Sequence, residues 1–145
     1  CTASATHKLD LVVSNAVVVS TNSRIDVSGL GYLPGRTTGN TTVGASTGGS
    51  GGSFGGLGGN IDGQANVVYG DYVDPDDWGS GSSGATGGYN GGSAGGGLVR
   101  VRAGALNLEG KLWANGVYNA HGAGSGGGML VVVGQLTGNG SMQAQ

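Results

Sequence analysis

The sequence has little of what would point to a familiar class of protein. Of its 145 residues, one is cysteine, two are proline and 10% are charged. The single cysteine, Cys1, excludes a disulfide framework within the chain; at this position it fits a lipid-modified N-terminus, a crosslink to another chain or a segment boundary. No apolar run approaches the roughly 18 residues of a membrane helix, and no basic segment followed by an apolar one marks a signal peptide. We therefore expect no membrane span.

Positive charge and helical patterns are equally scarce. The six Lys and Arg residues stand singly and the net charge is -2, so we expect no nucleic-acid partner. No apolar stripe with a spacing of 3.6 residues continues for three turns, because glycine interrupts every candidate. The sequence therefore predicts a chain that is essentially all β.

Glycine is what the sequence has in abundance. Of the 36 glycines, none precedes Gly29, 25 fall between 29 and 97, and 11 follow. The remaining sequence contains short β-branched runs, which are typical of strands. We expect a single β domain in three parts, which are a strand-rich first repeat at 1–29, a packed glycine-rich loop layer at 30–97, and further strand repeats at 98–145.

The strand-rich parts resemble one another. Residues 11–29 align without a gap to 98–116, and a third copy at 129–145 follows the second after one deletion. The first alignment pairs Val19 with Leu106, Ile25 with Leu112, Val27 with Ala114, and Gly29 with Gly116. The second pairs Leu106 with Leu136, Gly110 with Gly140, Leu112 with Met142, and Ala114 with Ala144. Repeats of this kind stack, because each buries its inner face only against its neighbours.

Two all-β architectures fit this pattern. Apolar and polar residues alternate along each repeat, and the linking turns are too short for a crossover helix, which favours a parallel β-helix or solenoid with a long ordered glycine-rich insertion. The alternative is an antiparallel β-sandwich, because the dipeptides at 109–110 and 139–140 suit hairpin turns.

The order of the glycine-rich blocks carries a resemblance. The strings IDVSGLGYLPG, GGSFGGLGGN, VYGDYVDP, GGGLVRVRAGALNLEGKLWANG and SGGGMLVVVGQLTGNGSMQAQ follow one another from residue 25 onward. They resemble the glycine-rich, β-helix-type repeat segments of very large secreted or surface-anchored bacterial proteins. That resemblance implies an extracellular or cell-surface, adhesin-like and non-catalytic module.

The densest glycine stretch is GGSGGSFGGLGGN at 48–60. A flexible linker is one interpretation; a backbone layer packed too tightly for side chains is the other. We favour the packed layer, with Gly55 and Gly58 inside it. The expected apolar anchors of this layer are Phe54, Leu57, Ile61, Val67, Val68, Tyr69, Tyr72, Val73 and Trp78.

Four of the eight acidic residues fall within GDYVDPDDWG at 70–79, namely Asp71, Asp74, Asp76 and Asp77. Carboxylate oxygens gathered in a turn suit Ca²⁺, so these residues are a candidate calcium site, although a solvated acidic turn begun by Pro75 is the simpler interpretation and the one we favour. Tyr72 and Trp78 in the same segment are a candidate saccharide-binding pair.

No set of nucleophile, base and orienting residue appears, so we expect no enzyme and no cofactor other than calcium. The two histidines, His7 and His121, lack the partners of a zinc site.

Stacked repeats leave strand edges that add further strands. The hypothesis is therefore a structural subunit or repeat of an extracellular fibre or surface adhesin, with itself as partner. Self-assembly would use the N-terminal strand, with Leu11, Val12, Val13, Val17 and Val19. The alternative is a module that binds surface glycans or a calcium-dependent ligand.

Overall fold

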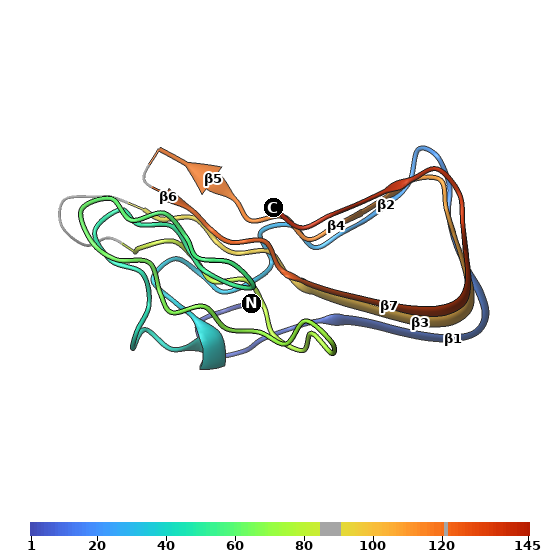
Figure 1. Cartoon of the computed structure of the whole chain (residues 1–145), viewed down its shortest axis with the longest axis horizontal. Helices are drawn as coiled ribbons and strands as arrows, with labels where there is room; N and C mark the ends of the chain where they lie inside the picture. The colour runs from blue at the N-terminus through green and yellow to red at the C-terminus, as the bar shows by residue number, and fades with distance from the viewer. Residues whose placement is uncertain (85–90, 121) are drawn as a thin grey trace.

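The computed structural model describes residues 1–84, 91–120 and 122–145 (Figure 1). Within these ranges the chain has strands and no α-helix, so the expected all-β character is confirmed there. A single 3-10 turn covers Thr38–Asn40. The strands are β1 (Leu9–Val19), β2 (Arg24–Asp26), β3 (Leu98–Leu108), β4 (Lys111–Trp113), β5 (Tyr118–Asn119), β6 (Gly122–Ala123), β7 (Gly128–Thr137) and β8 (Ser141–Gln143).

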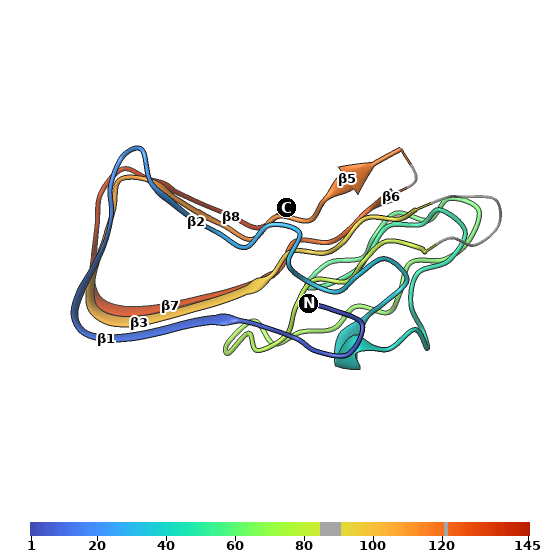
Figure 2. The same ribbon diagram turned by 180° about the vertical axis from the view of Figure 1, so that it is seen from behind.

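Six of these strands form two parallel sheets, ordered β1-β3-β7 and β2-β4-β8, while β5 and β6 make a small antiparallel pair. Figures 1 and 2 show the chain running along one sheet, turning at a corner and returning along the other, three times over. We call these three circuits pass 1 (9–29), pass 2 (98–116) and pass 3 (128–145). The strands before and after the turns at 109–110 and 139–140 lie in different sheets, so these turns are corners between sheets and not hairpins.

The register of the sheets tests the sequence repeat directly. Between passes 2 and 3 it is confirmed, because Leu106 pairs with Leu136 and Leu112 with Met142. Between passes 1 and 2 the pairing of Ile25 with Leu112 is confirmed. The pairing of Val19 with Leu106 is wrong, because Val19 lies opposite Leu108. An irregularity between Val13 and Ala16 and a longer corner in pass 1 shift the register, and a gapless alignment misses both.

The apolar core lies between the two sheets. Its buried residues come mostly from pass 2, which has a neighbour on each side, and include Val99, Val101, Leu106, Leu112 and Ala114. Residues of passes 1 and 3 continue the same rows and are only partly covered. The predicted alternation is confirmed in pass 1, where Val19 and Val27 are buried while Arg24 and Asp26 are exposed.

The glycine-rich part forms a second body beside the sheets, made of extended stretches that run next to one another (Figures 1 and 2). The stretch 79–84 lies at its centre, with Ser80, Ser82 and Ser83 fully buried. Its backbone is bonded to four other stretches, through Gly79 N to Gly96 O (2.9 Å), Gly81 N to Arg36 O (3.1 Å), Ser83 N to Ser50 O (2.9 Å) and Ser125 N to Ser80 O (3.0 Å). This central stretch is therefore bonded to more neighbours than the two that a strand has within a sheet.

Close backbone contact explains the glycines of this body. A Cβ on Gly81 would overlap the Leu33 carbonyl, and one on Gly95 would overlap the Gly79 carbonyl. Within 48–60 the result is divided: Gly49, Ser50, Gly52 and Ser53 are buried, whereas most of 55–60 is exposed. The packed-layer interpretation holds for Gly58, whose added Cβ would lie 2.7 Å from the Gly51 carbonyl oxygen, and it is wrong for Gly55, where a Cβ would meet nothing within 4 Å.

The prediction that nine apolar residues anchor this layer from within is wrong for most of them. Only Phe54, Tyr69 and Trp78 are partly buried. The other six, namely Leu57, Ile61, Val67, Val68, Tyr72 and Val73, are exposed. The interior of the glycine-rich body consists largely of backbone and small polar side chains, with Tyr32 as a buried large residue, and most of the predicted apolar anchors project outward.

No helix in the ranges that the structure describes is long and apolar enough to cross a bilayer.

Candidate functional site

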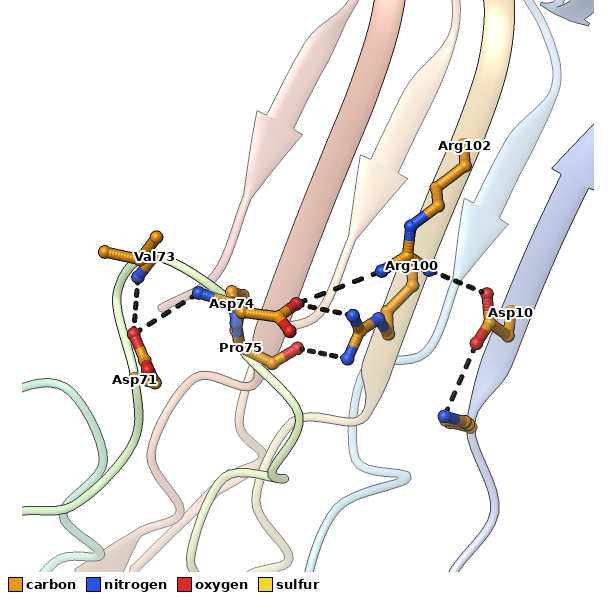
Figure 3. A network of polar contacts seen from close by, with 8 residues as sticks. Asp10, Asp71, Val73, Asp74, Pro75, Arg100 and Arg102 are labelled. Atoms are coloured by element: carbon orange, nitrogen blue, oxygen red, sulfur yellow. Dashed lines mark hydrogen bonds and ion pairs between the residues drawn. The ribbon is translucent and has the colours of Figure 1, made fainter.

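The acidic segment lies as a loop against the outer side of strand β3 (Figure 3). Asp71 shapes this loop, because its Oδ1 accepts hydrogen bonds from the backbone N–H groups of Val73 (2.7 Å) and Asp74 (3.3 Å). Asp74 then reaches the sheet and forms an ion pair with Arg100, 2.5 Å from oxygen to Nη2. The loop is therefore fastened to the central strand of its sheet.

Arg100 is unusual because it is a buried cation, with 7% of its surface exposed. Its Nη1 donates to the carbonyl oxygen of Pro75 (3.4 Å), and its Nε is buried without a hydrogen-bond partner. Burying a charge is costly unless a counter-charge accompanies it. Asp74 supplies that charge, so the loop compensates a cation that the sheet alone leaves uncompensated.

A second arginine extends the contact across two strands. Arg102 lies 3.9 Å from Asp74 and 3.7 Å from Asp10 of β1, and Asp10 is 3.4 Å from Lys8 (Figure 3). These groups are more exposed than Arg100, so each pair contributes little alone. Together they connect pass 1, pass 2 and the glycine-rich body through alternating charges.

Asp77 serves a separate polar centre. Its carboxylate accepts hydrogen bonds from the Tyr32 hydroxyl (2.5 Å) and the Thr38 hydroxyl (2.6 Å). Burial, followed by the hydrogen bond with Asp77, raises the pKa of Tyr32 well above its usual range. Burial likewise raises the pKa of Tyr69, whose hydroxyl donates to the Trp78 carbonyl and accepts from Ser80. Both phenols therefore stay protonated and act as internal hydrogen-bonding groups.

This arrangement does not support the predicted calcium site. Asp74 is directed to the arginines, Asp77 to Tyr32, and Asp76 is exposed. Nowhere in the described ranges do three or more His, Cys, Asp or Glu side chains gather as metal ligands. The four carboxylates are close in sequence, but the loop directs them to different parts of the fold. His121 lies outside the described residues.

The predicted saccharide-binding pair is also separated. Tyr72 is 98% exposed, whereas Trp78 is partly buried, with its ring centre 5.9 Å from that of Tyr32. The indole nitrogen of Trp78 donates to the His7 carbonyl (2.8 Å). The two aromatic side chains line different hollows, so they do not form one stacking surface.

The N-terminal strand predicted for self-assembly lies within its own sheet. The five residues proposed, Leu11, Val12, Val13, Val17 and Val19, all belong to β1, which pairs with β3. They divide between two faces, because Val19 is buried while Val12 is 77% exposed. The segment before β1 is held by the glycine-rich body, through Cys1 N to Leu30 O (2.7 Å), Asn40 Nδ2 to Thr2 O (3.1 Å) and Trp78 Nε1 to His7 O (2.8 Å). The arm does not extend away from this chain.

A groove beside pass 3 is not predicted by the sequence. Two adjoining hollows share Phe54, Gly55 and Gly127. One continues to Leu57 and Ala144, and the other to Tyr72 and Met129. We call the two hollows together the β7 groove. Its lining combines aromatic and aliphatic side chains with several glycines. The sequence carries a signal for this groove, because Phe54 and Leu57 interrupt the glycine run, but the packed-layer prediction places both side chains in the interior.

Comparisons with family models, with curated proteins and with solved structures gave no significant match to this chain.

Proposed function

We propose that this chain is a structural subunit or repeat of an extracellular fibre or surface adhesin, folded as a short parallel β-solenoid that lengthens by adding passes. The observation that carries the proposal is the matched register of both sheets. Val17, Leu106 and Leu136 form one row across β1, β3 and β7, and Ile25, Leu112 and Met142 form another across β2, β4 and β8. Each pass therefore repeats the surface on which the next one packs.

Hydrogen bonds just after β2, β4 and β8 support stacking in the same way. Val27 N donates to Trp113 O, and Ala114 N donates to Gln143 O, both at 2.8 Å. Gly29 N donates to Asn115 O (2.9 Å), and Gly116 N to Gln145 O (2.6 Å). Equivalent positions thus make equivalent bonds from pass to pass, which is the property that lets a repeat protein extend without a new type of contact.

The sheet edges give this stack a means of association. Within the described residues, β1 and β7 each pair with a strand on one side only. Leu136 on β7 continues a core row and remains 56% exposed. Unpaired strand edges are templates for further strands, and a head-to-tail contact that does not close produces a filament. The extracellular location is an inference from the resemblance of the glycine-rich blocks to surface-protein repeats.

The test is the assembly state of the chain. We expect concentration-dependent filaments by negative-stain electron microscopy and sedimentation velocity, because the edge rows of one copy can be covered by another. Leu136→Lys should abolish them by placing a charge in the row. Val43→Lys is the matched control, because Val43 is 81% exposed on the glycine-rich part, away from the sheets. A wild-type chain that remains a monomer at high concentration would contradict the proposal.

A further inference from the structure

We propose that the β7 groove and the adjoining edge of pass 3 bind a glycine-led strand, that is, an extended segment with glycine directly before its first apolar strand residue, as in residues 95–108. This inference rests on the proposed stacking and names the kind of repeat that stacks there. The binding partner is a further repeat of the pass 2 type, and not the glycine-free segment that leads into β1.

A recurring hydrogen bond indicates this partner. Gly97 N, before β3, donates to Val27 O of pass 1 (2.8 Å), and Gly127 N, before β7, donates to Ala114 O of pass 2 (2.7 Å). Val27 and Ala114 each stand two residues after an aligned core residue, Ile25 and Leu112. Ala144 stands two residues after Met142, the next member of that row, and it lines the β7 groove. The Ala144 carbonyl is therefore the next acceptor in the series.

The same contacts explain why the donor must be glycine. A Cβ on Gly97 would lie 2.7 Å from the Val27 carbonyl oxygen, and a Cβ on Gly127 would overlap the Gly97 carbonyl. Side chains do not tolerate such approaches to backbone, so only glycine fits. A segment that continues the layer on Gly127 and Ala144 meets the same restriction.

Pass 1 does not meet that requirement. By the register of β1 with β3, in which Leu9 lies opposite Val99, the residue equivalent to Gly97 is His7. Its carbonyl accepts the indole N–H of Trp78, which holds this segment on the glycine-rich body. A second copy that docks through β1 therefore pairs the sheet edges and leaves the β7 groove unfilled.

Gly55 offers a way to block the groove without disturbing the fold. It lines both hollows, and a Cβ there would meet nothing within 4 Å. Gly59 is equally open and exposed, and it does not line the groove. Neither glycine has a positive φ, so a larger side chain is compatible with the backbone at both positions. Gly55→Phe fills the groove, whereas Gly59→Phe removes a glycine without filling it. Comparison of the two variants therefore isolates the effect of a filled groove.

The experiment measures binding of a fluorescent peptide with the sequence of residues 92–116 to the full chain by anisotropy, with circular dichroism as a check of folding. We expect the wild-type chain and Gly59→Phe to bind alike, and Gly55→Phe to bind at least about tenfold more weakly. A peptide carrying Gly97→Val should lose affinity to a similar extent, as should one with the sequence of residues 5–29, which has no glycine before its strand.

The outcomes distinguish this inference from the proposed function. Filaments of the wild-type chain, together with no peptide binding or with equal binding by Gly55→Phe and Gly59→Phe, would overturn the inference and leave the fibre proposal standing. Equal affinity for the Gly97→Val peptide would also overturn it. Selective peptide binding by a chain that forms no filaments would support the glycine-led contact and contradict assembly of intact copies.

Discussion

At the scale of single residues, glycine has two different uses in this chain that its sequence context does not distinguish. Gly58 lies where a Cβ would be 2.7 Å from the carbonyl oxygens of both Gly51 and Gly52, whereas Gly55, three positions earlier, is open. Both belong to GG pairs next to a large apolar residue. The difference arises from the fold, because one stretch of backbone rests on another at Gly58 and the chain turns outward at Gly55.

This difference gives a direct prediction for stability. Gly58→Val should lower the free energy of unfolding by about 1–3 kcal/mol, the usual cost of forcing extra atoms into a packed site. Gly55→Val should change it by less than about 0.5 kcal/mol, as expected for an open surface position. Urea denaturation of the two variants beside the wild type measures both values. Equal effects of the two substitutions would show that the glycine-rich layer is not packed as described.

At the scale of elements, the loop that carries Asp74 fastens the glycine-rich body to strand β3. Arg100 has little exposed surface and no other carboxylate partner among the ion pairs of the described residues. Removing one member of a buried pair leaves the other charge uncompensated, which costs more than the pair contributes when intact. Asp74 itself is largely exposed, with 61% of its side chain accessible, so solvent screens part of that cost.

We therefore expect Asp74→Ala to destabilise the fold by about 1–2 kcal/mol, a loss in the range of a hydrogen bond to a charged group reduced by solvent screening. Asp76 is an exposed carboxylate of the same loop and forms no ion pair within the part of the chain that the structure describes, so Asp76→Ala should be close to neutral. Thermal unfolding followed by circular dichroism compares them. The double variant Asp74→Ala with Arg100→Met should recover part of the loss, because no buried charge remains; no recovery would argue against charge compensation as the role of Asp74.

The elements also show how far the sequence could predict this molecule. Apolar alternation and the repeat predicted the strands and the register of passes 2 and 3, because both are local properties. The register of β1 depends on the irregularity between Val13 and Ala16 and on the length of the corner after β1. Neither feature can be recognised from the types of the residues involved. Asp74 and Arg100 are 26 positions apart, and nothing local shows that one faces the other. The sequence clustering of the four aspartates therefore predicted a common site where the fold makes separate contacts.

At the scale of the whole molecule, the sheets and the glycine-rich body share backbone. The stretch ending at Gly97 is bonded to Gly79 and Tyr32 within the body and leads directly into β3, and residues 124–127 lead into β7 in the same way. Loss of packing in one part should therefore loosen the backbone of the other. The two parts should therefore unfold together, as small single domains usually do.

The two tryptophans test this cooperativity, because Trp78 reports on the glycine-rich body and Trp113 on sheet β2-β4-β8. In the single-tryptophan variants Trp113→Phe and Trp78→Phe, fluorescence should show urea transitions that coincide with that variant's own circular dichroism transition. A fluorescence transition of Trp78 at lower urea than loss of strand signal would mean that the body opens independently, as a locally less stable unit.

The buried serines and peptide groups of the glycine-rich body also determine how this protein responds to temperature. Exposure of apolar surface raises the heat capacity on unfolding, whereas exposure of polar surface lowers it. Much of this interior is backbone and hydroxyl, so we expect a heat-capacity change on unfolding below the about 12–15 cal/mol/K per residue of ordinary domains. A small heat-capacity change flattens the curve of stability against temperature. The protein consequently loses less stability on cooling than one of equal size held by an aliphatic core, because less of its stability depends on the hydrophobic effect.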